Sequence, residues 1–405
     1  MMMGPLLGLV FLLLIQGQCC LDCTVPSAQQ WLVTGLQTQL ENGVKQQSSP
    51  SPSVVMALNL AGGRDSTATK RLIQDIKGIK EMTSGKVALY ALSLQSSCVD
   101  PKDVPTAGGR VNVVSALEEK TNEEIKHYYD TGTPKTTNYQ LALDILALCV
   151  EKSPDAKNAA ATLIKIVKGC QSKGCFGVDT AAMVALALTC VHDGMSKGSK
   201  MEGAITETLR VITAQILDSQ QESGIIGNIY STGLAMQALS VTTEFYPAGA
   251  WKCTKTIDEV LRKLYEGAFT NPEAGSQILP SLVGKTYLDV ATLNCFSDPN
   301  ITVHYTVINQ LIGPYFNYSV TVKVLKGSVL LAALEAAQRV NPTIFSFQTE
   351  STSWGPMVIS IHGVNGSTDD KTYWQFLSGE KPLDQGVGSY KPTDNEHIVA
   401  KFSTY

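Results

Sequence analysis

The sequence has little of what marks several common classes of protein. Charged residues make up only 17% of its 405 residues, the net charge is -4, and no basic run alternates with aromatic side chains. Nucleic acid is therefore not expected as a partner. No apolar run reaches the roughly 20 residues that a membrane-spanning helix needs. We therefore expect no insertion into a membrane.

Patterns typical of catalysis or metal binding are also missing. The chain contains no G-x-S-x-G sequence and no P-loop, and its histidines lie far apart. The acids near the starts of the apolar helices, Asp144 and Asp179, are isolated rather than paired as glycoside hydrolysis requires. These absences favour a binding protein over an enzyme and predict no metal site.

The N-terminus and the cysteines both indicate export. Leu6 to Ile15 form an apolar run of signal-peptide length followed by small and polar residues, so we expect residues 1–20 to be a signal peptide, cleaved between Gly17 and Asp22. Eight of the ten cysteines remain after cleavage, and an even set in a secreted chain is typical of disulfides. Three sequons predict glycosylation at Asn300, Asn317 and Asn365.

Six apolar, alanine-rich segments recur between residues 27 and 282. Aligned on one leucine, they give Leu58, Leu92, Leu146, Leu186, Leu239 and Leu282, and most are separated by amphipathic stretches such as "AITETLRVITAQILDS". A repeat of one apolar and one amphipathic helix predicts stacked helix pairs. About six pairs favour closure into an α/α toroid, with an open solenoid as the alternative. Disulfides between distant repeats would favour the closed ring.

The last hundred residues have a different pattern. Segments such as "NITVHYTVINQL" and "GPMVISIHGV" are β-branched and partly alternating, and one helix is expected from Ser328 to just before Pro342. The predicted fold class is mainly α, an α/α toroid with a small C-terminal β-rich domain. The expected limits are 24–290 for the toroid, 291–300 for a linker and 301–405 for the β-rich domain.

Polar residues stand at the starts of the predicted inner helices, in "KTTNYQ", "GVDTAAM", "GNIYSTG" and "GSQILPS". Because helix N-termini gather at one end of a toroid, these residues are expected to converge on one mouth, where a ligand with apolar and polar groups would bind. The alternative is ordinary N-capping. Asp179 can serve both purposes, with one carboxylate oxygen capping its helix and the other facing a ligand.

Several strings together give the chain a specific resemblance. "CTVPSAQQ", "VDTAAM", "IIGNIYSTGLAMQALSVT", "QILPSLVGKTYLDV" and "KTYWQFLSGEKPL" resemble the vertebrate cobalamin carriers, namely intrinsic factor, haptocorrin and transcobalamin. The resemblance covers nearly the whole mature chain, and its motifs do not single out one of the three carriers. It implies an α/α toroid joined to a small β domain, with cobalamin as the cargo bound between them.

The resemblance also implies particular residues. The disulfides it implies are Cys23–Cys253, Cys98–Cys295 and Cys149–Cys190, which leaves Cys170 and Cys175 for a short-loop bond. The implied cobalamin contacts in the toroid are Thr136, Thr137, Tyr139, Gln140, Asp179, Asn228, Ser231 and Gln277. Those in the β domain are Ser353, Trp354, Gly355, Pro356, Met357, Val358, Trp374, Gln375, Phe376 and Leu377, extending toward Leu383. Trp354 and Trp374 have an alternative role as core aromatics.

Two positions depart from the family pattern. Cys175 stands where transcobalamin has a histidine that can bind cobalt, so no protein ligand to cobalt is expected. Lys86 stands where relatives often have glutamine, so that contact is not carried over. The implied function is a secreted, monomeric, non-catalytic cobalamin carrier that a cell-surface receptor takes up. The alternatives are a toroidal extracellular enzyme, such as a glycosidase or cyclase, and an interaction module with an empty cavity.

Overall fold

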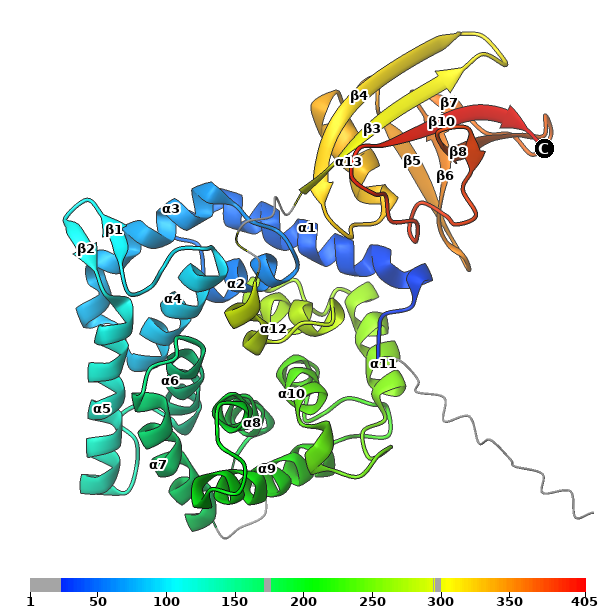
Figure 1. Ribbon diagram of the computed structural model, residues 1–405. Coiled ribbons are helices and arrows are strands. Elements are labelled where there is room, and N and C mark those ends of the chain that lie inside the picture. Colours follow the sequence, from blue (N-terminus) through cyan, green and yellow to red (C-terminus); the bar gives the residue numbers. More distant parts are fainter. Residues whose placement is uncertain (1–22, 171–175, 294, 296–299) are drawn as a thin grey trace, which may run out of the picture.

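Six helices form a closed inner ring (Figure 1). The computed structural model describes residues 23–170, 176–293, 295 and 300–405. The inner helices are α2 (Pro52–Leu60), α4 (Ser84–Ser96), α6 (Asn138–Val150), α8 (Val178–Asp193), α10 (Ile229–Val241) and α12 (Pro272–Leu282). Each contacts the next, and α12 contacts α2. The predicted toroid is confirmed, and the open solenoid is wrong.

The outer layer consists of helices that alternate with the inner ones along the chain. They are α1 (Gln30–Gln46), α3 (Ser66–Asp75), α5 (Val113–Thr131), α7 (Asp155–Gly169), α9 (Lys200–Asp218) and α11 (Cys253–Tyr265). Short 3-10 turns are η1 (Ser27–Gln29), η2 (Ile76–Glu81), η3 (Thr243–Phe245) and η4 (Tyr287–Thr292). A small hairpin of β1 (Val104–Thr106) and β2 (Gly109–Val111) joins α4 to α5, and the sequence analysis does not predict it.

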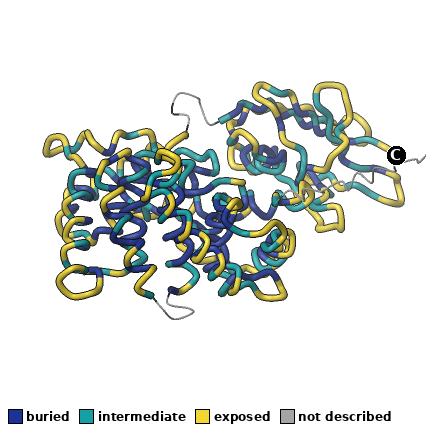
Figure 2. Tube along the Cα trace, turned by 60° about the horizontal axis from the view of Figure 1, so that its bottom comes forward, coloured by how far each residue is buried: buried dark blue, intermediate teal, exposed yellow. Residues whose placement is uncertain are grey.

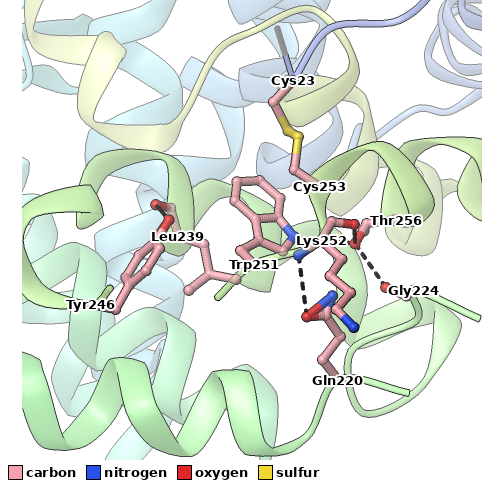
Figure 3. The surroundings of a disulfide bond; sticks show 9 residues. All are labelled: Cys23, Gln220, Gly224, Leu239, Tyr246, Trp251, Lys252, Cys253 and Thr256. Carbon is pink, nitrogen blue, oxygen red and sulfur yellow. Dashed lines mark hydrogen bonds between the residues drawn. A yellow bond between two sulfur atoms is a disulfide. The ribbon is translucent and has the colours of Figure 1, made fainter. Parts of the chain in front are cut away.

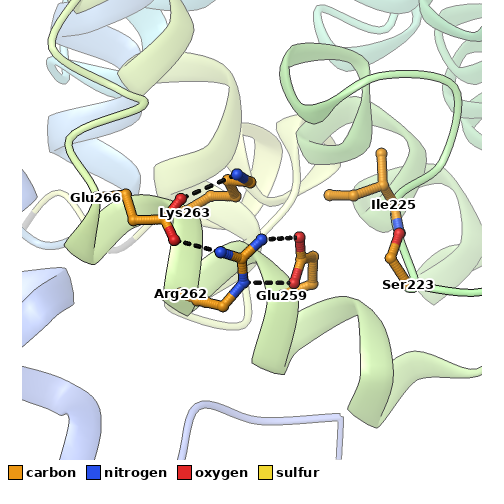
Figure 4. Close-up of polar contacts among 6 residues, drawn as sticks. All are labelled: Ser223, Ile225, Glu259, Arg262, Lys263 and Glu266. Carbon is orange, nitrogen blue, oxygen red and sulfur yellow. Dashed lines mark hydrogen bonds and ion pairs between the residues drawn. The ribbon is translucent and has the colours of Figure 1, made fainter.

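Burial explains which helices lie inside. Every residue of α8 from Ala181 to Thr189 is buried, as expected of a helix covered on all sides. The outer α11 instead buries one stripe that contains Ile257, Val260 and Leu261. Its solvent face carries ion pairs from Arg262 to two glutamates, one turn away on either side (Figure 4). Figure 2 shows the same division, with the buried trace inside and the exposed trace outside.

Between described cysteines, three disulfides have the pairings that the resemblance implies. Cys23–Cys253 joins the segment before α1 to the first residue of α11 across a Cα separation of 5.7 Å, Cys98–Cys295 spans 5.5 Å, and Cys149–Cys190 ties α6 to α8 across 6.2 Å. Beside the first bond, the Trp251 indole donates to Thr256, which donates to the Gly224 carbonyl (Figure 3). Cys170 is disulfide-bonded, and Cys175 lies outside the described residues.

The C-terminal part is built on a five-stranded sheet in the order β4-β3-β10-β8-β9, in which β3 and β10 are parallel and the other pairs antiparallel. A second sheet has the order β5-β6-β7. The strands are β3 (Asn300–Asn309), β4 (Phe316–Leu325), β5 (Phe347–Thr352), β6 (Gly355–Ile361), β7 (Val364–Asn365), β8 (Thr372–Ser378), β9 (Lys381–Pro382) and β10 (Glu396–Thr404).

The helix of this part, α13 (Leu330–Val340), packs on β3 and β4. It begins at Leu330, not at Ser328 as the sequence predicts. The carbonyls of Tyr390 and Val387 accept from the Leu330 and Leu331 amides, so a distant segment satisfies the first turn and no serine cap is formed. None of the described helices is both long and apolar enough to cross a membrane.

The two parts meet beside α1 (Figure 1). A cleft of about 580 Å³ lies there between α1, α2 and α3 on one side and β4 and α13 on the other. Gly63 contributes to the close approach, because a Cβ atom at this position would lie 3.3 Å from the Leu325 side chain.

Candidate functional site

Hydrogen bonds between neighbouring inner helices bring their N-terminal turns together at one end of the toroid. The Asp179 carboxylate of α8 accepts from the Ser231 hydroxyl of α10 at 2.9 Å. Gln140 of α6 accepts from the Gly85 amide of α4 at 3.3 Å. Glu273 of α12 accepts from Ser53 of α2 at 2.5 Å. The helix starts therefore surround one mouth.

The eight residues that the resemblance implies in the helical part lie just before or within the first two turns of α6, α8, α10 and α12. We call them the mouth cluster. They are Thr136, Thr137, Tyr139, Gln140, Asp179, Asn228, Ser231 and Gln277. Two are ordinary N-caps, because Thr137 accepts from the Gln140 amide and Asn228 accepts from the amides of Tyr230 and Ser231. The capping alternative is thus confirmed for these two positions.

For Asp179 the capping interpretation is wrong. Gly177 is the N-cap of α8 and makes no side-chain cap, while Asp179 lies inside the first turn. Its carboxylate bonds sideways to Ser231 instead. A negative side chain in the first turn is still favoured by the helix dipole. The carboxylate is therefore positioned by a neighbouring helix and not by its own backbone.

Tyr139 lies close to this carboxylate. Burial raises the pKa of Tyr139 well above its ordinary value, and the negative charge of Asp179 raises it further. The hydroxyl therefore stays neutral and remains a donor at physiological pH. The Thr136 Oγ1 atom is buried and has no hydrogen-bond partner among the described residues. Both groups are polar and lie in a largely buried setting beside Asp179 or at the start of α6.

Gln277 lies on α12, where a glycine allows close approach. The backbone carbonyl of Gln277 accepts from the side-chain amide of Gln237 at 3.2 Å. A Cβ atom on Gly233 of α10 would lie 2.6 Å from that carbonyl oxygen. Gly233 therefore permits α10 and α12 to pack tightly at this level.

One residue buried inside the ring, Tyr287, is not predicted from the sequence. Tyr287 of η4 is buried, its amide donates to Gln237 of α10 at 3.0 Å, and η4 also contacts α2, α4, α6 and α8. Burial raises the pKa of Tyr287 strongly, with contributions from Tyr139 and Glu273 on opposite inner helices. η4 thus packs against several inner helices from inside the ring. The string "KTYLDV" has no hydrophobic periodicity that would predict this packing, because a single short turn makes all the contacts.

The β-domain residues form a second group, the hairpin cluster, which comprises residues 353–358 and 374–377. Ser353 and Trp354 make the turn between β5 and β6, and the Trp354 side chain is 87% exposed. Gly355 has a φ of +103°, which favours glycine at the end of this turn. The core-aromatic alternative is therefore wrong for Trp354.

Trp374 behaves differently. Its ring is buried, and its indole N–H donates to the Val364 carbonyl at 2.9 Å, so the core-aromatic alternative is confirmed for this ring. A hollow of about 250 Å³ lies beside it. The hollow is lined by residues of the β-rich part, namely Pro356, Met357, Val358, Tyr373, Trp374, Gln375, Phe376, Pro382, Leu383, Gln385, Gly386 and Val387.

The structure gathers the implied residues into these two clusters. The larger cleft beside α1 is separate, since the described residues that line it belong to neither cluster. Its lining is rich in charge and includes Glu41, Arg71 and Glu335. Burial raises the pKa of Glu335, Arg339 opposes that shift, and Glu41 across the cleft adds to it.

Comparison with known proteins identifies the family of this chain. The family model described as eukaryotic cobalamin-binding protein matches residues 5–309. The chain belongs to this family. Residues 327–404 of this family member match a second model, described as a domain of unknown function.

The similarity to named relatives covers nearly the whole chain. The chain is 43% identical to cobalamin binding intrinsic factor of Canis lupus familiaris, over 95% of this chain and 94% of that protein. It is 34% identical to transcobalamin-1 of Homo sapiens, over 99% and 98%. Among solved structures, haptocorrin in complex with Cbi matches with a TM-score of 0.59 and 33% identity, covering 95% of this chain and 99% of that one.

Proposed function

We propose that the protein is a secreted, monomeric carrier that binds cobalamin between the mouth cluster and the hairpin cluster and delivers it through a cell-surface receptor. In this proposal residues 1–20 are the signal peptide, and 291–300 link the toroid, 24–290, to the β-rich domain, 301–405. The observation that carries it is the convergence of polar groups from α6, α8 and α10 at one mouth, in a chain of the cobalamin-binding family.

The chemistry of the two clusters suits a corrinoid. Its ring has an apolar face and a rim of amides, which both donate and accept hydrogen bonds. Asp179 accepts from an amide N–H, while the Tyr139 hydroxyl donates to an amide carbonyl. The hollow beside Trp374 offers an apolar surface. Two half-sites on one chain raise the effective concentration of the second contact, which favours slow release.

A binding role fits the acids at the mouth better than catalysis does. Asp179 and Glu273 are each hydrogen-bonded to a serine of the neighbouring helix, Ser231 and Ser53. A glycosidase needs one carboxyl free to protonate the leaving group and a second to act as base or nucleophile. Engaged carboxylates are better suited to fixed recognition, so we propose no enzymatic activity.

The three sequon asparagines of the β-rich part differ in how far they are exposed. The sequon asparagines Asn317 and Asn365 are exposed, while Asn300 is half-buried and lines the cleft beside α1. We therefore propose glycans at Asn317 and Asn365 first. The disulfide between Cys170 and Cys175 remains a prediction, and with a cysteine at position 175 we propose no protein ligand to cobalt.

Equilibrium dialysis with labelled cyanocobalamin at nanomolar concentration tests the proposal. The wild-type protein should retain the ligand. Asp179→Asn should weaken binding about tenfold or more, because a hydrogen bond to a charged group contributes about 1.5–3 kcal/mol. Asp193→Asn is the matched control, since Asp193 ends the same helix and is exposed. Absence of retention by the wild-type protein would end the proposal.

A further inference from the structure

A buried carboxylate behind the mouth connects three elements of the helical part. Glu124 on the outer helix α5 is only 1% exposed. Its Oε1 atom accepts from the Ser84 hydroxyl at the start of α4, at 3.1 Å, and its Oε2 atom accepts from the Thr136 amide just before α6, at 2.8 Å. One side chain of the outer layer thus joins the first turn of one inner helix to the segment that begins the next.

The segment fixed in this way holds half of the mouth cluster. Residues 136–140 contain four of its eight members, and the Thr136 hydroxyl is buried without a partner among the residues described. The amide of Thr136 donates to Glu124, so its hydroxyl lies on the same fixed backbone. The position of that hydroxyl depends on the backbone that Glu124 fixes.

A second contact between the same elements makes the placement tighter. The Gly85 amide, next to Ser84, donates to Gln140 at 3.3 Å. A Cβ atom on Gly85 would lie 2.6 Å from Cγ of Gln140, so the absence of a side chain there lets Gln140 lie against α4. Ser84 and Gly85 thus bind the two ends of the 136–140 segment, one through Glu124 and one directly.

The surroundings of Glu124 are those of an interior group. Asp144 of α6 is fully buried nearby. Burial raises the pKa of Asp144 well above its ordinary value, the Ser84 hydroxyl opposes that shift, and the charge of Glu124 adds to it. Glu124 accepts hydrogen bonds from both Ser84 and Thr136, so neither oxygen of this buried carboxyl is left without a partner.

We propose that Glu124 is a positioning residue of the cobalamin site, which fixes residues 136–140 at the mouth without contacting the ligand. This inference rests on the proposed function, because it assigns a role within the same site. The neighbouring residue gives a natural contrast. Glu123 pairs with the ammonium of Lys135, the residue just before the 136–140 segment, at 2.7 Å. Both side chains are more than half exposed, so water screens this contact.

The test compares five full-length variants with the wild-type protein. Dissociation of labelled cyanocobalamin is measured after dilution, and hydrogen exchange of the peptide containing residues 133–140 is measured without ligand. Glu124→Ala should speed dissociation about tenfold, since two buried hydrogen bonds are lost, and should accelerate exchange at Thr136. Glu124→Gln should restore most of the wild-type rate, because its amide oxygen can accept from Thr136 while Ser84 accepts from its NH₂ group.

Glu123→Ala is the matched surface control and should leave both measurements within about twofold of wild type. Ser84→Ala should speed dissociation about threefold, as one of the two bonds is lost. It keeps the inference testable if Glu124→Ala fails to fold. The control for Ser84 is Ser93→Ala, which removes a buried hydroxyl farther along the same helix.

The outcomes separate the two ideas. If the wild-type protein does not retain cyanocobalamin, the proposed function fails. If it does, and Glu124→Ala or Ser84→Ala releases the ligand no faster than its control, the proposed function stands and the positioning role is overturned. The positioning role is also overturned if glutamine at position 124 is as damaging as alanine, since geometry would then not be what Glu124 supplies.

Discussion

The two halves of the candidate site differ in how far their groups are satisfied within the protein. In the mouth cluster, Asp179 bonds to Ser231, and Thr137 and Asn228 cap their helices. In the hairpin cluster, Trp354 is 87% and Met357 52% exposed. The comparison shows a pre-arranged helical wall and an exposed β-hairpin. In the proposed function, the wall would set ligand orientation and the apolar surface of the hairpin would be buried when ligand binds.

Two acids, one from each part, also differ in what sets their pKa. Burial raises the pKa of Glu151, at the end of α6, to about 7, while Lys102 opposes and Asp100 supports that shift. Burial alone would also raise the pKa of Glu396 in β10, but hydrogen bonds from Ser378, Thr393 and Tyr390 lower it below its ordinary value. Glu151 therefore holds its proton to a higher pH than an ordinary glutamate, and Glu396 stays charged to a lower pH.

The largest expected effect distinguishes the two tryptophans of the hairpin cluster. Trp374→Ala should lower the free energy of unfolding by about 3–5 kcal/mol, because a buried aromatic ring and its bond to Val364 are lost. Trp354→Ala should leave that free energy nearly unchanged and speed cobalamin release instead. Urea unfolding and ligand dissociation measure the two effects. Similar losses of stability in both variants would contradict the distinction.

The next expected effect is an opposite dependence on pH. The folded protein binds the Glu151 proton more tightly than the unfolded chain, so its share of the stability falls as pH rises from about 4.5 to about 7. For Glu396 the sign is reversed, and its share is lost as pH falls below about 4.5. The measurement is the melting temperature from pH 3 to 8. In Glu151→Gln it should fall less as the pH rises from about 4.5 to about 7, and in Glu396→Gln it should fall less as the pH drops below about 4.5.

The smallest effect is expected on the outer surface of the toroid. Arg262 bonds to Glu259 and Glu266 on α11, but its side chain is half exposed (Figure 4). Arg262→Ala should therefore leave the free energy of unfolding nearly unchanged, because water screens these ion pairs. Cobalamin dissociation should not change. A change in dissociation would mean that this surface is coupled to the site.

Much of the helical fold follows from the sequence, because a helix buried on all sides has an unmistakable composition. The run of buried residues in α8 from Ala181 to Thr189 is apolar except at its end. Six such helices favour closure of the ring but leave an open solenoid as the alternative, and only the contact between α12 and α2 decides between them. The small hairpin of β1 and β2 was not predicted, as three residues a strand leave no pattern.

What the sequence does not contain are the contacts between distant segments. The start of α13 depends on the carbonyls of Val387 and Tyr390, which no local pattern reveals. The role of Asp179 depends on Ser231, which lies on another helix. Glu124 stands in "TNEEIKH", where it looks like any solvent-facing glutamate, and only its distances to Ser84 and Thr136 indicate otherwise.

The central claim is that one cobalamin contacts both clusters, and hydrogen exchange with and without cyanocobalamin tests it most directly. The account predicts slower exchange on binding in two sets of peptides, those containing residues 136–140, 178–181 and 228–231 of the toroid and those containing 353–358 and 374–377 of the β-rich part. Protection confined to one set, or found instead along the cleft beside α1, would contradict it.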